Sequence, residues 1–218
     1  LSANGITVGG HVSFIGSTAD EPFDPVFVDA ELLDSLNKNY FSVISSDAKK
    51  QMQDEIAVAK AKGDSIGGEI EIAVVGLTAG IGSPIARGVE NAVSAAVFTV
   101  PAVKGIEFGD GFGFASMYGS EANDSMYFEN GSVKCRTNHC GGITGGITNG
   151  MPLILRVAIK PTPSIAIKQD TVDLISGENA ELVIEGRHDP CIVPRALPAV
   201  EAAVSLALLD LLTEVEKL

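Results

Sequence analysis

Hydrophobic and polar residues alternate in several short stretches of the chain, which is the pattern of a β-strand with one buried face. The clearest case is residues 69–75, where Ile70, Ile72 and Val74 alternate with two glutamates and an alanine. Apolar runs of strand length, bounded by Gly or Pro, indicate further strands. The predicted strands are residues 12–15, 69–75, 104–108, 151–159 and 180–185.

A second pattern, with apolar residues every three or four positions, predicts three helices. The first covers residues 46–62, with a serine and an aspartate that can cap its start, and ends at Gly63. The second covers residues 84–99 and starts with a proline, which the first turn of a helix tolerates. The third begins at Arg195 or Pro198 and ends near residue 217.

Two of these helical segments are similar to each other. Residues 88–96 read Gly-Val-Glu-Asn-Ala-Val-Ser-Ala-Ala, and residues 199–207 read Ala-Val-Glu-Ala-Ala-Val-Ser-Leu-Ala. Each follows a predicted strand and a loop, which favours a duplicated strand–loop–helix unit, although alanine-rich core helices also look alike without duplication. We therefore predict an α+β fold in which antiparallel strands pack on core helices.

Two polar segments are predicted to be loops. Residues 20–25 hold two prolines and three acids, so we expect an exposed loop rather than a calcium site, since no EF-hand spacing is present. Residues 109–150 are rich in Gly, Asn and Ser, and such a long aperiodic segment is typically functional or disordered. His11 lies in an apolar run and is expected in the core or at the surface, without a functional role.

The composition restricts the possible partners. The chain has 15 Lys and Arg and 28 Asp and Glu, a formal net charge of −13, so nucleic acid is not an expected partner. An anionic small molecule would need a local group of Arg and Lys. Three cysteines do not indicate a disulfide framework and favour a reducing cytoplasm. No signal peptide is visible, and the most apolar stretch, residues 92–103, is too short to cross a membrane.

The strongest candidate for chemistry is the run Gly-Arg-His-Asp-Pro-Cys at residues 186–191, just after a predicted strand. Arg187 offers a bidentate fork for phosphate or carboxylate. Asp189 can exchange a proton, with a pKa lowered by the neighbouring arginine. His188 can either bind an anion or exchange a proton. The alternative is a structural turn in which Arg187 and Asp189 form an ordinary ion pair.

Two other runs combine small or rigid residues with polar groups. Residues 138–146, Asn-His-Cys-Gly-Gly-Ile-Thr-Gly-Gly, can bring backbone N–H groups close to an anion, or can form a flexible glycine loop. Residues 160–164, Lys-Pro-Thr-Pro-Ser, can form a phosphate cradle or a turn that ends a strand. A zinc site at Cys135, His139 and Cys140 is disfavoured, because their spacing is not that of a zinc knuckle. We therefore expect no metal and thiols that behave as small apolar groups.

Together these runs resemble chorismate synthase closely, in order and from near Leu1 to near Leu218. The resemblance includes residues 101–112, Pro-Ala-Val-Lys-Gly-Ile-Glu-Phe-Gly-Asp-Gly-Phe, and the pairs Gly119-Ser120 and Asn123-Asp124. It implies a β-α-β sandwich with an internal duplication, incomplete in this chain, and a homotetramer.

The resemblance also implies an activity. The family converts 5-enolpyruvylshikimate 3-phosphate to chorismate and phosphate by a 1,4-elimination that needs reduced FMN. The flavin is thought to donate electron density that helps phosphate leave, and then to help remove the C6 hydrogen. The resemblance also leads us to expect the use of NADP.

Several of the motifs contact the flavin in the family. The resemblance assigns Asp189 to proton transfer at the flavin, and it assigns a cationic pocket to Lys160, Arg187 and Arg136. Pro101 stands where the family often has Asn, so only a backbone contact is expected there. The cofactor-binding residues implied by the resemblance are Pro101, Ala102, Gly145, Lys160, Pro161, Thr162, Pro163, Ser164 and Arg187.

Two motifs of the family do not occur in this sequence. One is a Ser/Thr-x-His-Gly motif with a proposed catalytic histidine, and the other is an Arg- and Ser-rich motif that binds substrate and flavin. We therefore interpret residues 1–218 as one domain, the C-terminal part of a chorismate synthase, and expect the chain alone to be inactive and to bind FMN weakly or not at all. The alternatives are a non-catalytic anion- or flavin-binding module, and a zinc-dependent enzyme that uses Cys135, His139 and Cys140.

Overall fold

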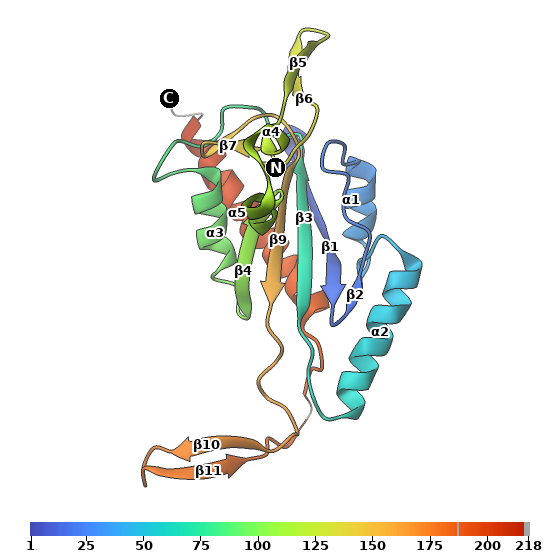
Figure 1. Cartoon of the computed structure of the whole chain (residues 1–218), viewed down its shortest axis with the longest axis vertical. Helices are drawn as coiled ribbons and strands as arrows, with labels where there is room; N and C mark the ends of the chain where they lie inside the picture. The colour runs from blue at the N-terminus through green and yellow to red at the C-terminus, as the bar shows by residue number, and fades with distance from the viewer. Residues whose placement is uncertain (187, 216–218) are drawn as a thin grey trace.

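The computed structural model describes residues 1–186 and 188–215, and its centre is a five-stranded antiparallel sheet (Figure 1). The strands lie in the order β2-β1-β3-β9-β4. Their bounds are β1 Thr7–Ile15, β2 Thr18–Ala19, β3 Gly68–Val75, β4 Val103–Phe108 and β9 Leu153–Ile159. Every neighbouring pair is antiparallel. The predicted α+β fold is therefore confirmed.

Four helices pack around this sheet. Helices α3 (Val89–Val97) and α5 (Val193–Val215), which contain the two similar sequences, lie against each other beside the sheet (Figure 1). Helix α1 (Ala30–Leu36) packs on β1, and α2 (Ser46–Ala61) packs beside β1 and β2. The two similar segments thus belong to one helical layer.

Two adjacent glycines in β1 let helices approach the sheet from both sides. A Cβ atom at Gly9 would lie 2.8 Å from the Cβ of Leu33 in α1, and one at Gly10 would lie 3.0 Å from Cδ1 of Leu197 in α5. Successive strand residues point to opposite faces, so α1 and α5 cover opposite faces of the sheet. A side chain at Gly9 would push α1 away from β1, and one at Gly10 would clash both with Ile72 of β3 and with α5.

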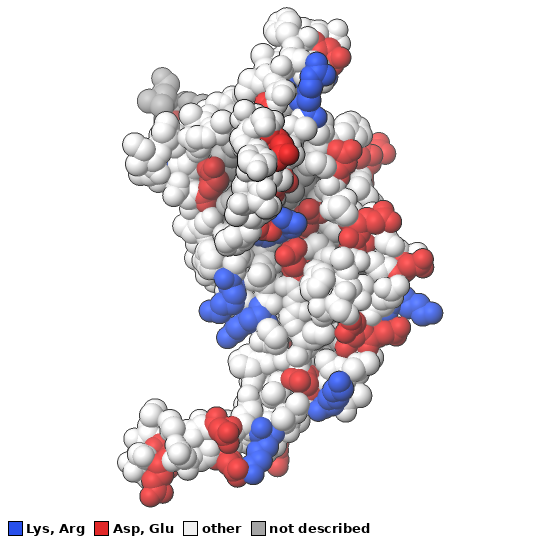
Figure 2. Space-filling model, viewed as in Figure 1, with Lys and Arg blue, Asp and Glu red and all other residues white. Residues whose placement is uncertain are grey.

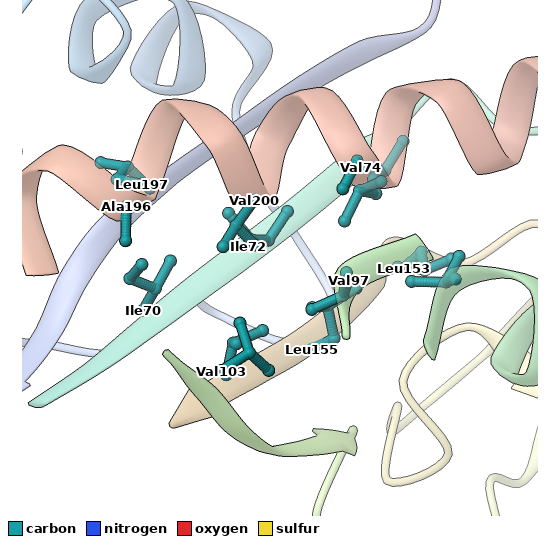
Figure 3. Packing of buried hydrophobic residues seen from close by; sticks show 14 of the residues in the cluster. Ile70, Ile72, Val74, Val97, Val103, Leu153, Leu155, Ala196, Leu197 and Val200 are labelled. Carbon is teal, nitrogen blue, oxygen red and sulfur yellow. The ribbon is translucent and has the colours of Figure 1, made fainter. Parts of the chain in front are cut away.

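The main core lies between α5, α3 and the sheet. Figure 3 shows Leu197 and Val200 of α5 above Ile70 and Ile72 of β3. Burying each such side chain contributes about 1.5–3 kcal/mol. By length and composition alone α5 is apolar enough to cross a membrane, with a mean hydropathy of 1.7 over its most apolar window. Its packing in this core accounts for part of that apolar character, because 44% of the window is buried, whereas Leu206 and Leu209 are exposed.

The segment 109–150 contains more regular structure than its composition predicts. Its short elements are η2 Gly111–Ser116, α4 Gly119–Ala122, β5 Met126–Glu129, β6 Ser132–Cys135, β7 Ile143–Thr144 and β8 Ile147–Thr148. A further short helix, η1 (Ser2–Asn4), lies at the start of the chain. β5 pairs with β6, and β7 pairs with β8. The segment is therefore ordered rather than disordered, and its strands of two to four residues are too short to show alternation in the sequence.

A two-stranded ribbon projects from the body (Figure 1). It consists of β10 (Gln169–Asp173) and β11 (Glu178–Leu182), which pair only with each other. The predicted strand 180–185 overlaps β11 in part, whereas β10 was missed. Most side chains of β10 are exposed, so the sequence of β10 carries no alternation between buried and exposed positions.

Three predicted boundaries also differ from the structure. The second helix begins at Val89 rather than at residue 84, because Ser83 N–H donates to the Arg87 carbonyl at 3.1 Å and closes a loop before the helix. Ser45, not the next residue, caps α2. β1 begins at Thr7, five residues earlier than predicted, since its glycine pair interrupts the apolar pattern.

The loop of residues 20–25 is partly buried, which corrects the prediction of an exposed acidic loop. The Asp20 side chain is fully buried, and Oδ2 of Asp20 lies 2.8 Å from Nδ1 of His11. On the other side of the ring, His11 Nε2 lies 2.9 Å from Oε2 of Glu71 in β3. The same Glu71 oxygen accepts the Phe23 N–H at 2.9 Å. His11 is therefore a core residue that joins the loop to two strands.

The charges of this network support one another. Asp20 also accepts the backbone N–H groups of Ile44 at 2.6 Å and Ser45 at 2.9 Å, just before α2. Burial lowers the pKa of His11, but hydrogen bonds and charges from Asp20 and Glu71 outweigh burial and raise it above its usual value. Burial raises the pKa of Asp20, but hydrogen bonds from His11, Ile44 and Ser45 outweigh it and lower that pKa.

The linkage between folding and protonation follows from these directions. The contribution of His11 to stability is complete below its unfolded pKa, and it is lost as pH rises through the raised folded pKa. The contribution of Asp20 is complete above its unfolded pKa, and it is lost as pH falls through the lowered folded pKa. The network therefore stabilises the fold most between these two limits.

We predict that Asp20→Asn lowers the free energy of unfolding by about 3 kcal/mol, because it leaves a buried cationic His11 without one partner. Urea unfolding in a mildly acidic buffer measures this change. Glu21→Gln removes an exposed carboxylate from the same loop and is the matched control. Equal stability of the two variants would contradict the assigned role of the network.

The turn between α3 and β4 holds a strained residue. Ala102 has a φ of 74°, in the left-handed region. For a residue with a Cβ atom this conformation costs about 1–2 kcal/mol. The Ala102 carbonyl accepts the Lys160 N–H at 2.9 Å, which ties the turn to the end of β9.

We predict that Ala102→Gly raises the free energy of unfolding by about 1 kcal/mol, since glycine adopts this conformation without the steric cost. Ala95→Gly, at an exposed position of α3, should lower it by about 1 kcal/mol. Urea unfolding of both variants tests the difference in sign. Destabilisation by both would show that Ala102 is not strained.

Candidate functional site

Three of the predicted motifs meet at one end of the sheet, where β9 ends and where β3 and β4 begin. The Lys160 N–H reaches the Ala102 carbonyl, which joins residues 160–164 to the turn that holds Pro101. Ser65 Oγ donates to the Thr162 carbonyl at 2.6 Å. The loop before β3, which contains Ser65, therefore contacts the motif of residues 160–164.

The same loop also contacts the motif of residues 186–191. The Ile66 N–H donates to the Pro190 carbonyl at 2.8 Å, immediately after Asp189. Gly67 follows, and a Cβ there would lie 2.7 Å from the Ile159 carbonyl oxygen and 2.9 Å from Cδ of Pro161. A residue without a side chain lets the loop cross the end of β9 at this distance.

Within this group, the Thr162 hydroxyl oxygen is buried and has no hydrogen-bond partner in the structure. An unsatisfied buried hydroxyl is costly, so a polar atom of a ligand would be a favourable partner. Lys160, at the start of the same run, is exposed. Residues 160–164 therefore combine a cation and an unpaired hydroxyl, which fits the predicted contact with a flavin.

Asp189 lines a cavity of about 550 Å³. Its Oδ2 accepts from Nη1 of Arg195 at 2.9 Å, and its Oδ1 accepts the Cys191 N–H at 3.3 Å. The other residues of the wall are Tyr40, Lys60, His188 and Pro190. A carboxylate held between a guanidinium and a backbone N–H keeps a fixed orientation toward the cavity, as proton transfer requires.

The cations of this site differ in part from the expected ones. Figure 2 shows acidic side chains spread over the visible face, with basic ones in small separate groups. Lys60 and Arg195 line the Asp189 cavity. Arg136 follows β6 at the other end of the sheet and stacks 4.8 Å from the Tyr127 ring, so it does not join this site (Figure 1). Arg187 lies outside the described residues.

Gly145 also lies away from the three motifs. It forms the two-residue turn of the β7–β8 hairpin with Gly146, and both glycines have a positive φ. The Gly146 carbonyl accepts the Val89 N–H at 2.9 Å, at the start of α3, whereas Ala102 follows the end of that helix. The structure therefore does not bring Gly145 together with the other predicted cofactor residues.

Residues 138–146 form a tightly bonded loop, not a flexible one. Asn138 donates to the Pro25 and Pro152 carbonyls and accepts the Gly142 N–H. The Asp124 carboxylate accepts the N–H groups of His139 and Cys140. These bonds explain why the loop and the Asn-Asp pair occur together in the sequence.

The cysteines are all free, and Cys135 and Cys191 are buried. Burial raises the pKa of the Cys140 and Cys191 thiols to about 11. Without a metal, such thiols are protonated at neutral pH. Within residues 1–186 and 188–215, no group of three or more His, Cys, Asp or Glu is arranged to hold a metal ion.

Sequence reasoning did not assign Tyr40, Lys60 and Arg195 to the site. Lys60 lies in the last turn of α2, more than a hundred residues from Asp189 along the chain, and only the fold brings the two together. Arg195 carried a weak signal, as a cation at the start of the helix that follows the Asp189 loop. Its role depends on where α5 begins.

Comparison with known proteins places the whole chain in one family. The family model described as chorismate synthase matches residues 1–213. The chorismate synthase of Methanosarcina mazei is 42% identical over 210 residues, which cover 96% of this chain and 56% of that protein. The chorismate synthase of Thermococcus gammatolerans is 51% identical over 164 residues, 75% of this chain and 46% of that protein.

A solved structure is also similar. A crystal structure of chorismate synthase superposes with a TM-score of 0.78 at 28% sequence identity, over 98% of this chain and 59% of the other. The chain thus spans a little over half the length of the relatives that it matches most fully. On the sequence motifs, the family model and the shared fold, the chain belongs to the chorismate synthase family.

Proposed function

We propose that this chain, together with the remaining length found in its relatives, catalyses the 1,4-elimination of phosphate from 5-enolpyruvylshikimate 3-phosphate to give chorismate. Membership of the family supports the reaction. The observation that carries the proposal is Asp189, oriented by Arg195 in a cavity that also holds Lys60 and that is linked through Ile66 to the loop beside Thr162.

The proposed role of each residue follows from its chemistry. In the elimination, the C3–O bond to phosphate breaks and a proton leaves C6, so the site needs a proton acceptor and cations for the anionic substrate. Asp189 is the acid–base group and takes part in proton transfer at the flavin. Lys60 and Arg195, with Arg187, balance the charge of the phosphate and carboxylates.

Reduced FMN, when bound, supplies electron density that helps phosphate to leave. Ala102 and Pro101 offer backbone contacts, and Lys160 to Ser164 offer a cation, an unpaired hydroxyl and rigid prolines on which the cofactor is held. Gly145 belongs to the proposed set of flavin contacts through the family resemblance alone. The use of NADP, a cytoplasmic location and a homotetramer are part of the same proposal.

We predict that Asp189→Asn in the longer protein slows phosphate release by about 10²–10⁴-fold, the usual contribution of a general acid or base. The assay measures phosphate from 5-enolpyruvylshikimate 3-phosphate with reduced FMN under anaerobic conditions. Asp170→Asn, on the projecting ribbon, is the control and should keep the wild-type rate. Residues 1–218 alone should release no phosphate.

Two results would favour the alternatives. Flavin binding without turnover in the longer wild-type protein would indicate a non-catalytic binding module. Stoichiometric zinc in the purified protein, with turnover lost on chelation, would indicate a zinc enzyme. An Asp189→Asn variant as fast as the wild type would remove Asp189 from the mechanism while leaving the activity itself established.

A further inference from the structure

A second cavity, of about 400 Å³, adjoins the cavity of Asp189. The two cavities share Tyr40 and Arg195 as lining residues. One wall of the second cavity is the loop after α1, with Lys38, and the other is the start of α5, with Glu201. None of the family motifs falls in this cavity.

Glu201 is an unusual residue for such a wall. Its Oε1 is buried and has no hydrogen-bond partner in the structure. Burial raises the pKa of Glu201 to about 7, although the backbone N–H of Gly10 partly offsets this effect. A large share of the carboxyl groups is therefore neutral near pH 7, and a neutral carboxyl can donate a hydrogen bond.

The helix that carries Glu201 also has an irregular hydrogen-bond pattern at its start. Pro198 lies inside α5 and has no N–H, so the carbonyl of Pro194, four residues earlier, lacks its usual helical partner. Pro194, Pro198 and Glu201 all line the cavity. On this side of the cavity Glu201 Oε1 is therefore unpaired, and the Pro194 carbonyl has no N–H donor at residue 198.

The cations of the cavity stand apart from Glu201. The titratable groups that face it are Lys38 and Tyr40 from the loop after α1, and Arg195 from α5 itself. No ion pair joins Glu201 to Lys38 or Arg195 in the part of the chain that the structure describes. The acid and the two cations therefore line one cavity without forming ion pairs with one another.

We propose that this cavity is a carboxylate subsite, in which the Glu201 carboxyl donates a hydrogen bond to the ligand and Lys38 and Arg195 balance the charge of that ligand. Arg195 gives Nη1 to Asp189 and has further N–H groups to offer the neighbouring cavity. The inference rests on the proposed function for its ligand class, a cyclic hydroxycarboxylate. The carboxylate of such a ligand would lie beside Arg195 and next to the cavity of Asp189.

The test uses residues 1–218 and shikimate, which carries a ring carboxylate and no phosphate. Backbone amide shifts in NMR spectra report the affinity at about pH 6 and about pH 8. The fraction of neutral Glu201 falls about tenfold over this interval, so the affinity of the wild type should fall about tenfold. Glu201→Gln keeps a donor and cannot ionise, so it should bind equally at both pH values and about tenfold tighter than the wild type near pH 8.

Glu90→Gln is the matched control, because Glu90 occupies the equivalent place in the similar sequence of α3. It should keep the pH dependence of the wild type. A pH dependence that comes from any group other than Glu201 would persist in Glu201→Gln. Lys38→Ala is a second variant, and it should bind shikimate more weakly at both pH values.

Several results would overturn the proposal. They are an affinity of the wild type that does not change with pH, a pH dependence that persists in Glu201→Gln, equal binding of shikimate methyl ester, and absence of shikimate binding. None of these results bears on phosphate release by the longer protein or on its loss in Asp189→Asn. The failure of this inference and the failure of the proposed function are therefore distinguishable.

Discussion

The close packing of α5 across β1 is the contact on which the other features depend. It is possible because Gly10 has no side chain where Leu197 crosses the strand. The same packing covers β3 and belongs to the largest group of buried apolar residues in the part of the chain that the structure describes (Figure 3). It also fixes where α5 begins, and the beginning of α5 places Arg195 beside Asp189 and Glu201 beside the loop after α1.

Around that helix, the candidate site is assembled by a few backbone bonds between loops that are distant in sequence. One joins Lys160 to Ala102, and another joins Ile66 to Pro190. The cost of this arrangement is visible as a left-handed φ at Ala102 and as an unpaired hydroxyl at Thr162. Strain and unsatisfied polar groups often gather where a ligand binds, and here they occur in the motifs that the sequence singled out.

The sequence predicted the strands and helices whose apolar faces are long and regular. The alternation at residues 69–75 and the helical pattern of α5 correspond to elements of the core, because burial on one face imposes the period. Where glycine replaces the apolar residue, as at Gly9, or where both faces are exposed, as in β10, the period is missing and the strand was shortened or missed. His11 was misjudged because its partners, Asp20 and Glu71, meet it only in the fold.

The same distinction holds for the site. Motifs such as residues 160–164 and Asp189 are recognisable because their residue types are unusual in sequence. Lys60 is an ordinary surface cation in sequence, and it becomes part of the site only because α2 ends beside the Asp189 loop. Glu201 looks like any glutamate in an amphipathic helix, and nothing in the sequence indicates that its carboxyl is buried.

The most direct test of the account is whether the gathered motifs form one flavin site. NMR spectra of the protein at the length of its relatives, recorded with and without FMN, report the backbone amides of Ala102, Thr162 and Asp189. The account predicts that these three signals shift together, with the same dependence on FMN concentration. Shifts confined to the region of Gly145, with these three unchanged, would contradict it.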